Sequence, residues 1–527
     1  MQALSAKRVI VIGAGMGGLS AALDLARQGV SVTLIERAAT PGGKMREVKV
    51  AGINIDAGPT VFTMRWVFES LFNDAGATLG ECLTLEPASV LARHAWRGGE
   101  TNVTQQSQPS QLDLFADIDA SADAIGNFAS AKDAEGYRRF CKRSQSIYKT
   151  LQHTYIANQR PSPLDLVRRV GLTNLGSLLN IAPFRSLWNE LGQYFPDPRL
   201  QQLFGRYATY VGSSPALAPA TLMLIAHVEQ DGVWTVNGGM RRIADALQSL
   251  GKQHGARYEY NTHVNEIIVK YGRITGVRIT RGGVGSSGDN NTEELYADAV
   301  VFNGDVSALG TGLLGPAVTP IAKPTKANAR SLSAITWNIC MPVDAAKKRY
   351  TPHHHNVFFS ANYLAEFDAV FRQRRICNAP TVYVCAQDRP FTGEADHATG
   401  MTHERFLVLV NAPADGDTAT FLPEALDAIT KNAFTLMHDC GFQLDSENAV
   451  VTTPEKFNGL FPATGGALYG RANHGAMASF ARLGAKTIID GLYLAGGSVH
   501  PGPGVPMATL SGRLAAQQLI TDLVRKA

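Results

Sequence analysis

The sequence predicts an α/β protein organised around a nucleotide-binding βαβ unit near the N-terminus. The first observation is a run of four β-branched residues, Val9–Ile12, that leads directly into GAGMGG at 13–18. The second is the helical spacing of apolar residues over 19–26, which a glycine follows. The third is another apolar strand, 30–35, that finishes in Glu36. Strand, glycine-rich turn, helix and strand therefore follow one another in a single register.

The glycine-rich turn has a specific chemistry in this context. Glycines let the backbone turn tightly and come close to a pyrophosphate, while the N-terminus of the helix supplies N–H groups and a positive dipole. Glu36 can accept hydrogen bonds from a ribose. The residues of the turn that we expect at the nucleotide are Gly13, Gly15, Met16, Gly17 and Gly18. The alternative is a plain βαβ unit with a glycine-rich turn.

Two short motifs after the second strand indicate which dinucleotide is bound. Arg37 is followed by PGGK at 41–44 and by INIDAGP at 53–59. This arrangement resembles the extended N-terminal signature of the flavin amine oxidase and phytoene desaturase superfamily, in which these loops cover the flavin side of the cofactor. The resemblance implies FAD and extends the site to Arg37, Gly42, Gly43, Lys44, Gly58, Pro59 and Thr60. The alternative is a pair of surface turns.

Composition limits the other classes of function. A chain of 527 residues is too long for one core and should hold two or three domains. The net charge of +4 is too mild to indicate a nucleic-acid partner, and no basic run with interleaved aromatics occurs. The six cysteines include no C-x-x-C pair, so neither a zinc site nor a disulfide scaffold is expected, and a reducing cytosol fits.

Membrane contact, if there is any, is expected to be peripheral. Lys7-Arg8 before an uncharged run imitates a secretory signal, but cleavage there would destroy the nucleotide motif. No other apolar run approaches the roughly 20 residues that a membrane span requires.

The stretch after the first domain is expected to be a polar loop followed by helices. Gly98–Gly136 is rich in Gln and Ser, which indicates a flexible surface loop, and 136–228 has helical patterns. Aliphatic residues over 164–188 alternate with arginines, so this segment either lies flat on a bilayer or packs on the protein's own core. The segment 206–227 suits an apolar tunnel wall or a buried helix pair.

The nucleotide domain resumes at Gly232 and contains a hairpin in which Val264 is expected to meet the adenine through its backbone, as in the superfamily. An insert at 282–289 reads as a flexible tip. Alternating strand patterns between 307 and 454 predict a mostly antiparallel sheet that faces the substrate. The run His353–His355 is predicted to be a solvated turn, and no metal is expected.

The C-terminal stretch 490–512 combines a strand with a glycine-rich turn and a helix, which predicts a second close approach of backbone to the cofactor. Its expected contacts are Gly496, Gly497, Gly504, Val505 and Pro506. Many flavoproteins have Gly-Asp at this strand end, whereas Gly497-Ser498 stands here, so we expect backbone contacts and no acid.

GGSVHPGPGVPMATLSG at 496–512 and GPTVFTMRWVFE at 58–69 make the resemblance more specific. They are similar to the bacterial carotenoid desaturases of the phytoene desaturase family, most of all to the 1-hydroxycarotenoid 3,4-desaturases (hydroxyneurosporene or methoxyneurosporene dehydrogenases). The resemblance implies a Rossmann-like FAD-binding domain of the flavin amine oxidase type, a mixed substrate domain of sheet and helices, and a helical region. The expected division is FAD-binding domain 1–95, 229–306 and 457–527, helical substrate or membrane-contact region 96–228, and substrate-binding sheet domain 307–456.

The implied reaction is the FAD-dependent introduction of a C-3,4 double bond into acyclic 1-hydroxycarotenoids such as hydroxyneurosporene, in carotenoid biosynthesis of the spheroidene or spirilloxanthin type. The expected partners are a long acyclic carotenoid, peripheral membrane lipid on the inner face of the cytoplasmic membrane, and oxygen or a quinone as electron acceptor. His500, beside the expected flavin turn, is a candidate for steering a proton or the substrate hydroxyl; the alternative is a histidine that hydrogen-bonds the loop backbone.

Other functions remain open at this point. Within the same fold these are a phytoene-type desaturase, a carotene isomerase, or a protoporphyrinogen or amine oxidase. A flavin-free isoprenoid-binding protein of the GDI type is the non-enzymatic alternative, which the glycine motif and Glu36 disfavour.

Overall fold

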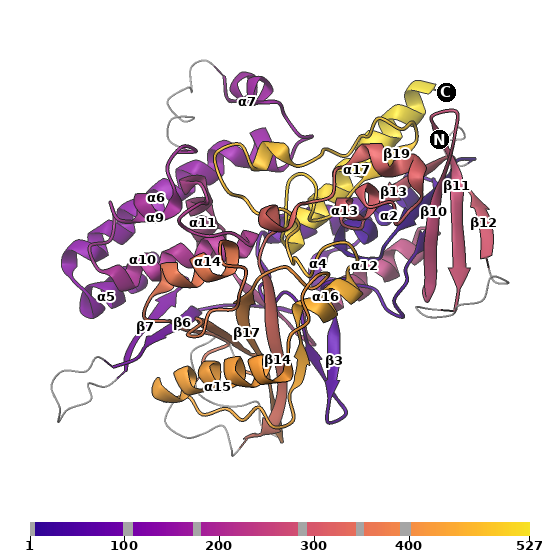
Figure 1. Cartoon of the computed structure of the whole chain (residues 1–527). Helices are drawn as coiled ribbons and strands as arrows, with labels where there is room; N and C mark the ends of the chain where they lie inside the picture. Colours follow the sequence, from indigo (N-terminus) through magenta and orange to yellow (C-terminus); the bar gives the residue numbers. More distant parts are fainter. Residues whose placement is uncertain are drawn as a thin grey trace.

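The structure is a computed structural model that describes residues 6–98, 109–171, 181–282, 292–343, 352–389 and 402–526. Three regions stand out in Figure 1: a parallel sheet with its helices on the side of the two termini, a helical region on the other side, and an antiparallel sheet below them. Residues 172–180 and 283–291, and most of the glutamine-rich run near 105, lie outside the described residues. The expected flexible tip near Ser286 is therefore not described.

The nucleotide-binding region is built on a five-stranded parallel sheet with the order β19-β13-β1-β2-β9. Its strands are β1 (Arg8–Ile12), β2 (Ser31–Ile35), β9 (Arg257–Glu259), β13 (Ala299–Phe302) and β19 (Leu492–Leu494). Every residue of β13 and β19 is buried, because both faces of the sheet are covered, and this explains their continuous apolar sequences. Three segments that are far apart in sequence thus form one sheet.

Helices cover one face of this sheet and a smaller sheet covers the other. The helices are α2 (Met16–Arg27), α12 (Arg241–Gln253) and α17 (Val505–Lys526). Helices α2 and α17 touch through their backbones, because a Cβ placed on Gly512 would stand 2.0 Å from the Gly17 carbonyl oxygen. The opposite face packs on an antiparallel sheet of β10 (Thr262–Lys270), β11 (Arg273–Arg281) and β12 (Thr292–Tyr296). The predicted hairpin is confirmed.

The antiparallel sheet has seven strands in the order β18-β14-β17-β16-β15-β6-β7. Its strands are β6 (Val90–Trp96), β7 (Ser110–Phe115), β14 (Ser333–Pro342), β15 (His355–Phe358), β16 (Val382–Ala386), β17 (His403–Ala412) and β18 (Val450–Thr452). All neighbours pair antiparallel except β15 and β6, which are parallel. Helix α15 (Pro423–Asp439) packs its apolar side on one face of the sheet.

The prediction of a flexible loop over Gly98–Gly136 is wrong for the part that the structure describes. Residues 110–115 form strand β7, and α5 (Ile118–Phe128) and the start of α6 (Ala131–Leu151) follow it. The sequence signal was weak because β7 is an edge strand and α5 is short. Strands β6 and β7 also extend the sheet of the expected substrate domain with residues from well before position 307.

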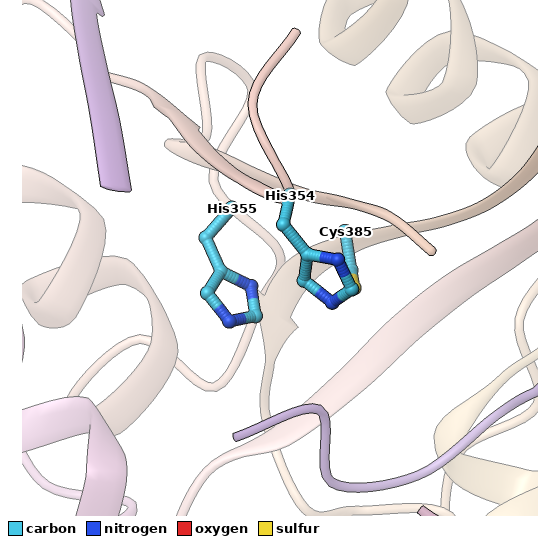
Figure 2. A group of neighbouring side chains, drawn as sticks. All are labelled: His354, His355 and Cys385. Atoms are coloured by element: carbon cyan, nitrogen blue, oxygen red, sulfur yellow. The ribbon is translucent and has the colours of Figure 1, made fainter. Parts of the chain in front are cut away.

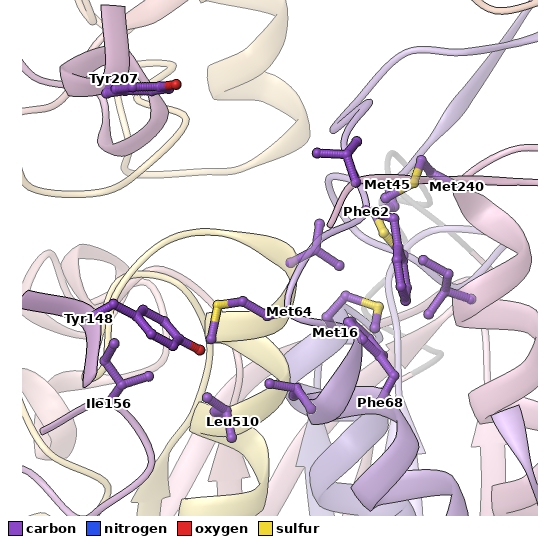
Figure 3. Packing of buried hydrophobic residues seen from close by; sticks show 14 of the residues in the cluster. Met16, Met45, Phe62, Met64, Phe68, Tyr148, Ile156, Tyr207, Met240 and Leu510 are labelled. Atoms are coloured by element: carbon purple, nitrogen blue, oxygen red, sulfur yellow. The ribbon is translucent and has the colours of Figure 1, made fainter. Parts of the chain in front are cut away.

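The helical region consists of short helices around α6. They are the π-helical turn η1 (Gln152–Ile156), α7 (Pro163–Val170), α9 (Leu187–Leu191), α10 (Pro198–Gly205), the 3₁₀ turns η3 (Arg206–Val211) and η4 (Ala220–Met223), and α11 (Leu224–Gln230). Their core is continuous with that of the nucleotide-binding region: Figure 3 shows Tyr148 and Ile156 beside Met64 and Leu510, with Met16 and Phe68 next to them. The two regions are therefore packed as one body.

Smaller elements connect these regions. They are β3 (Glu47–Val50), β4 (Ile53–Asp56), α3 (Arg65–Asp74), α4 (Leu79–Cys82), β5 (Leu85–Pro87), β8 (Trp234–Val236), α13 (Val306–Gly310), η6 (Pro316–Ile321), η7 (Ala327–Ala329), α14 (Tyr363–Phe371), α16 (Pro454–Leu460) and η9 (Ser479–Ala481). Among the described residues, no helix combines the length and the apolar character that crossing a bilayer requires.

Candidate cofactor and substrate site

A cavity of about 1020 Å³ runs between the parallel sheet, the helical region and the antiparallel sheet. Its lining includes every residue that the sequence assigns to the cofactor except Gly18; His500, the candidate for steering a proton or the substrate hydroxyl, is also outside the lining. The lining members are Gly13, Gly15, Met16, Gly17, Glu36, Arg37, Gly42, Gly43, Lys44, Gly58, Pro59, Thr60, Val264, Gly496, Gly497, Gly504, Val505 and Pro506. Segments that are far apart in the sequence thus meet at one cavity; their contact with FAD remains a prediction.

The glycines of this lining are required by close backbone packing. A Cβ on Gly17 would lie 2.6 Å from the Asn303 Oδ1 atom and 2.8 Å from the Gly496 nitrogen. A Cβ on Gly58 would lie 1.9 Å from the Lys44 carbonyl oxygen. Because these contacts leave no room for a side chain, the backbone itself forms the wall of the cavity. Such a wall fits a pyrophosphate, which backbone N–H groups bind at close range.

Gly18 has a different task from its neighbours. A Cβ there would stand 1.9 Å from the Gly13 carbonyl oxygen, so this glycine lets helix α2 pack directly on the turn that follows β1. Its position away from the cavity corresponds to the glycine of this motif that serves close helix–strand packing.

Glu36 stands at the end of β2 with its carboxylate already oriented. The Ala14 N–H donates to Oε2 at 2.7 Å and the Ala38 N–H donates to Oε1 at 2.8 Å. A carboxylate has about four acceptor positions, so two backbone donors leave capacity for ribose hydroxyls. The donor and acceptor chemistry of this end of the cavity therefore fits the adenosine part of FAD.

We call the glycine-rich part of the cavity lining the cradle, and two cations, Lys44 and Arg482, lie next to it. Burial lowers the pKa of Lys44 to about 8, although the neighbouring Asp305 carboxylate opposes this shift. Its ammonium donates to the Leu468 carbonyl oxygen. Burial also lowers the pKa of Arg482 to about 10, and its guanidinium donates to the Gly497 carbonyl oxygen at 3.1 Å. Two positively charged side chains therefore lie near the glycine-rich backbone, which suits an anionic cofactor.

His500 lies outside the cavity lining and serves the backbone of a neighbouring loop. It is 3% exposed, and its Nε2 bonds the Asn158 carbonyl oxygen at 2.8 Å. The Tyr155 ring meets it edge-on at 4.7 Å between centroids, and burial lowers the pKa of His500 to about 4. These contacts favour the second of the two interpretations given for this histidine, a residue that holds the loop, over a role in steering protons or substrate.

Beyond the cradle, the lining of the cavity is mostly apolar, and we call this part the tunnel. Its wall there is formed by Leu151, Ile156, Leu166, Ile181, Pro183, Val211, Leu222, Leu224, Ile225, Val228 and Phe480. The segment 206–227 supplies several of these residues, as the tunnel interpretation of the sequence expects. Trp188, the last residue of the segment 164–188 that either lies on a bilayer or packs on the protein's own core, packs against Tyr363 and next to Gly205.

A buried polar cluster interrupts the apolar wall. The hydroxyl of Tyr207 donates to Glu229 at 2.8 Å, and Tyr210 donates to the other carboxylate oxygen. Arg206 lies 5.2 Å over the Tyr210 ring. Arg206, Tyr210 and Glu229 all line the cavity. No local sequence pattern predicts this cluster, because Glu229 is at the end of an ordinary helix and Arg206 comes before a tyrosine-rich turn.

The prediction of a solvated turn at His353–His355 is wrong. His354 and His355 are 7% and 4% exposed, and Figure 2 shows both rings near Cys385 of the adjacent strand. The potential ligand atoms of His354, His355 and Cys385 lie within 4.8 Å of one another. The Nδ1 atom of His354 is hydrogen-bonded to the Arg389 carbonyl oxygen, and the Nδ1 atom of His355 to the Tyr383 hydroxyl. Burial raises the pKa of Cys385, which works against the thiolate form that binds metals. We interpret the histidines as hydrogen-bonding residues.

Asn303 is a functional position that sequence reasoning passed over. It follows β13, and its side-chain amide stands among Gly13, Gly17 and Gly496. Its place directly after a buried parallel strand is the signal that could have identified it, since ligands of such sheets bind at the carboxyl ends of the strands.

The parallel sheet, the two glycine-rich turns and the shared cavity define a dinucleotide-binding oxidoreductase scaffold. Residues 16–342 match the model of the family "Flavin containing amine oxidoreductase". The chain is 50% identical to hydroxyneurosporene desaturase of Rubrivivax gelatinosus, over 99% of this chain and 94% of that protein. It is 30% identical to 1-hydroxycarotenoid 3,4-desaturase of Flavobacterium sp. strain P99-3, over 97% and 98% of the two chains. Cyclohexylamine oxidase of Brevibacterium oxydans shares the fold, with a TM-score of 0.53, 14% identity and 99% of each chain covered.

The chain belongs to the flavin containing amine oxidoreductase family. It is an FAD-dependent oxidoreductase, and the predicted fold class is confirmed. The GDI-type alternative is thereby disfavoured. The cradle of glycines, the acceptor Glu36 and the flanking cations all fit FAD.

Proposed function

We propose that this protein is an FAD-dependent carotenoid desaturase that introduces a C-3,4 double bond into acyclic 1-hydroxycarotenoids. The observation that carries the proposal is one cavity that joins a nucleotide cradle to a long apolar tunnel. The names of the relatives in Rubrivivax and Flavobacterium support the substrate class. A volume of about 1020 Å³ lies at the upper end of the range of about 300–1,000 Å³ for ligand pockets, as a cofactor plus part of a polyene requires.

In this proposal, FAD would be held by the lining residues between Gly13 and Thr60, by Val264, and by the lining residues between Gly496 and Pro506. Bound FAD supplies the capacity to accept a hydride. The chain's own residues hold the polyene beside it and exclude water, because the tunnel wall is aliphatic and the helical and nucleotide-binding cores are continuous. The electron acceptor in this proposal is oxygen or a quinone. The division of the chain into FAD-binding, helical and sheet domains is part of the proposal.

We further propose that the protein works as a peripheral protein on the inner face of the cytoplasmic membrane. Four large apolar side chains are exposed near the tunnel: Leu164, Phe184, Leu217 and Met477, which we call the apolar rim. Phe184 is 88% exposed, and Leu164 is 71% exposed on helix α7. Leu166 of the same helix lines the cavity, as do Pro183 beside Phe184 and Ala476 beside Met477. Such a rim would let an oily substrate pass from lipid into the tunnel.

Charge supports this orientation. Arg168 and Arg185 are exposed next to the apolar rim, where they would face anionic head groups. Clusters of exposed aliphatic and aromatic side chains with arginines at their edge are typical of proteins that lie on a bilayer. The flat-lying interpretation of the segment after Pro163 therefore applies to its exposed residues, whereas Leu166 and Val170 pack inward.

The proposed reaction is tested with the FAD-loaded protein and hydroxyneurosporene in liposomes. We expect a red shift of the pigment spectrum and a product that is lighter by two hydrogens. A product of unchanged mass would indicate an isomerase, and an unchanged substrate beside fully bound flavin would contradict the desaturase assignment.

The membrane proposal has its own test. Phe184→Glu and Leu164→Glu should lower the fraction of protein that floats with anionic vesicles about 10-fold, since each places a charge in the interface. Leu422→Glu is the matched control, because Leu422 is 64% exposed before helix α15, which lies at the other end of the molecule from α7 in Figure 1. Equal flotation of all three variants and the unmodified protein would contradict the proposed orientation.

A further inference from the structure

A chain of hydrogen bonds links the cofactor cradle to the antiparallel sheet. The Thr60 Oγ1 atom lies 2.7 Å from the Tyr383 hydroxyl, and that hydroxyl lies 2.7 Å from the His355 Nδ1 atom. Tyr383 is on β16, and His355 begins the neighbouring strand β15. All three residues line the cavity. The chain therefore forms a polar patch in a cavity that is otherwise largely aliphatic.

The position of Thr60 brings this patch next to the reacting end of the cavity. Thr60 follows directly after Gly58 and Pro59, which belong to the predicted flavin side of the cradle. Gly58 is fixed there by its close approach to the Lys44 carbonyl. A ligand group that reaches Thr60 is consequently adjacent to the place where the flavin ring is expected, and not at the far end of the tunnel.

The hydrogen-bonding capacity of this chain is incompletely used. If the Tyr383 hydroxyl donates to His355, then Thr60 donates to Tyr383 and keeps acceptor positions on its oxygen. If His355 donates instead, Tyr383 donates to Thr60, and the Thr60 hydroxyl hydrogen is left to donate elsewhere. With either direction of the hydrogen bonds, the Thr60 hydroxyl can form one more hydrogen bond with a ligand, as an acceptor in the first case and as a donor in the second. Among the described residues, its side-chain partner is Tyr383. An alcohol, which both donates and accepts, satisfies both arrangements.

The hydrogen-bonded side chains of His355 and Tyr383 favour their uncharged forms and so act by hydrogen bonding. Burial lowers the pKa of His355 well below its usual value, and the neighbouring His354 and Arg206 act in the same direction. Burial raises the pKa of Tyr383 well above its usual value. Both shifts favour the uncharged forms, which suits recognition of a polar, uncharged group.

Further buried polar atoms that line the cavity have no hydrogen-bond partner among the described residues. Among the described residues, the Tyr363 hydroxyl, the Thr336 hydroxyl and the Arg206 Nε atom are buried without a hydrogen-bond partner, and all three residues line the cavity. A buried polar atom without a hydrogen-bond partner destabilises the protein. A purely hydrocarbon ligand would leave these groups unsatisfied, whereas one with a hydroxyl at this end, or with water carried beside it, would not.

We propose that Thr60 and Tyr383, with His355 as the positioning residue behind them, bind the tertiary hydroxyl of the substrate and so select hydroxylated polyenes. This inference rests on the proposed function, since it names the group that the same site recognises. In a 1-hydroxycarotenoid, only C2 separates the hydroxyl-bearing carbon from C3, so the hydroxyl has to lie close to the reacting bond. A polar patch adjacent to the expected flavin position meets that requirement, and the remaining polyene then runs out through the tunnel.

The test compares the alcohol with its parent hydrocarbon. Binding of hydroxyneurosporene and of neurosporene to the FAD-loaded protein is measured by quenching of intrinsic fluorescence, and kcat/KM is measured for both. Tyr383→Phe and Thr60→Val each remove a hydroxyl and keep the shape. We expect each change to reduce the preference for the alcohol 10- to 100-fold, which is the range for the loss of a hydrogen bond in a dry site. Thr60→Ser should restore most of the preference.

The matched control is Thr221→Val. Thr221 also lines the cavity, but its hydroxyl donates to the Ile181 carbonyl at 2.7 Å, so this change should affect both ligands alike and leave their ratio unchanged. A ratio that stays at the wild-type value in Tyr383→Phe and Thr60→Val, with flavin still bound, overturns the inference. Absence of desaturation with an intact preference for the alcohol would instead contradict the proposed function, so the two failures are distinguishable.

Discussion

The Asn303 side-chain amide donates a hydrogen bond to the Gly13 carbonyl oxygen, with 3.1 Å between nitrogen and oxygen. The same side chain touches the C-terminal turn, because a Cβ on Gly496 would stand 2.7 Å from its Oδ1 atom. One asparagine in the middle of the chain thus fixes the distance between the two glycine-rich turns that line the cofactor cavity. This relationship leads to the first prediction.

Asn303→Leu should weaken FAD binding about 10-fold and lower the free energy of unfolding by about 1–2 kcal/mol, since it keeps the volume and removes the hydrogen bond. Flavin release during dilution and denaturant unfolding measure the two effects. Asn54→Leu serves as control, because the exposed Asn54 amide bonds only another surface residue, Glu47, in the described structure. Equal affinity in both variants would show that Asn303 does not position the turns.

Gly15→Val should produce a folded protein that lacks flavin. Gly15 is the N-cap of α2, and its added Cβ would lie 3.0 Å from the Asn303 Nδ2 atom, in the wall of the cavity. The absorption of oxidised flavin after purification reports the result, and circular dichroism reports the fold. At Gly80, where an added Cβ meets nothing within 4 Å, the same change should leave flavin bound. A yellow Gly15→Val protein would contradict our assignment of the pyrophosphate position.

His500→Ala should retain turnover per bound flavin within a few-fold of wild type. The imidazole bonds the Asn158 carbonyl and packs on Tyr155, so its removal is expected to cost about 1–3 kcal/mol of stability rather than a chemical step. Steady-state rates normalised to flavin content, together with thermal unfolding, separate the two effects. A rate loss of 1000-fold or more with flavin fully bound would restore His500 as a participant in the chemistry.

The free energy of unfolding should decrease as the pH is lowered from about 6.5 to about 4. Burial lowers the pKa of His354, His474 and His500 to about 4, while the unfolded chain titrates near 6.5. In that window the unfolded state binds more protons, so unfolding becomes easier as the pH falls, by about 1–3 kcal/mol for each group. Thermal unfolding over pH 4–8 measures this slope, and His500→Gln should make it shallower. A slope that the substitution leaves unchanged would exclude His500 as a contributor.

Much of the nucleotide-binding region can be predicted from sequence because its signals are local. Strand β1, the glycine turn, helix α2 and Glu36 are contiguous, and each residue type is required by its backbone position. The antiparallel strands β14, β16 and β17 likewise carry their own alternating or continuous apolar patterns.

The rest depends on contacts that no local pattern contains. The pairing of β6 with β15 joins residues near 94 to residues near 357, and the pairing of β7 with β6 makes part of the expected loop a strand of the same sheet. His355 reads as solvated because its sequence neighbours are polar, yet every residue of β15 is buried and the Tyr383 hydroxyl lies at hydrogen-bonding distance from its imidazole. The polar patch with Thr60 draws on three separate segments, so only the tertiary structure reveals it.

The parallel sheet is complete only when β19, residues 492–494, takes its place beside β13, and helix α17 then closes over α2. During synthesis on the ribosome, the N-terminal strand and its turn therefore emerge long before their partners exist. Such non-local pairing is slow to form. The cavity is therefore complete only once residues 492–526 have been made, and a chain that lacks them should have an unfinished sheet and should not retain its flavin.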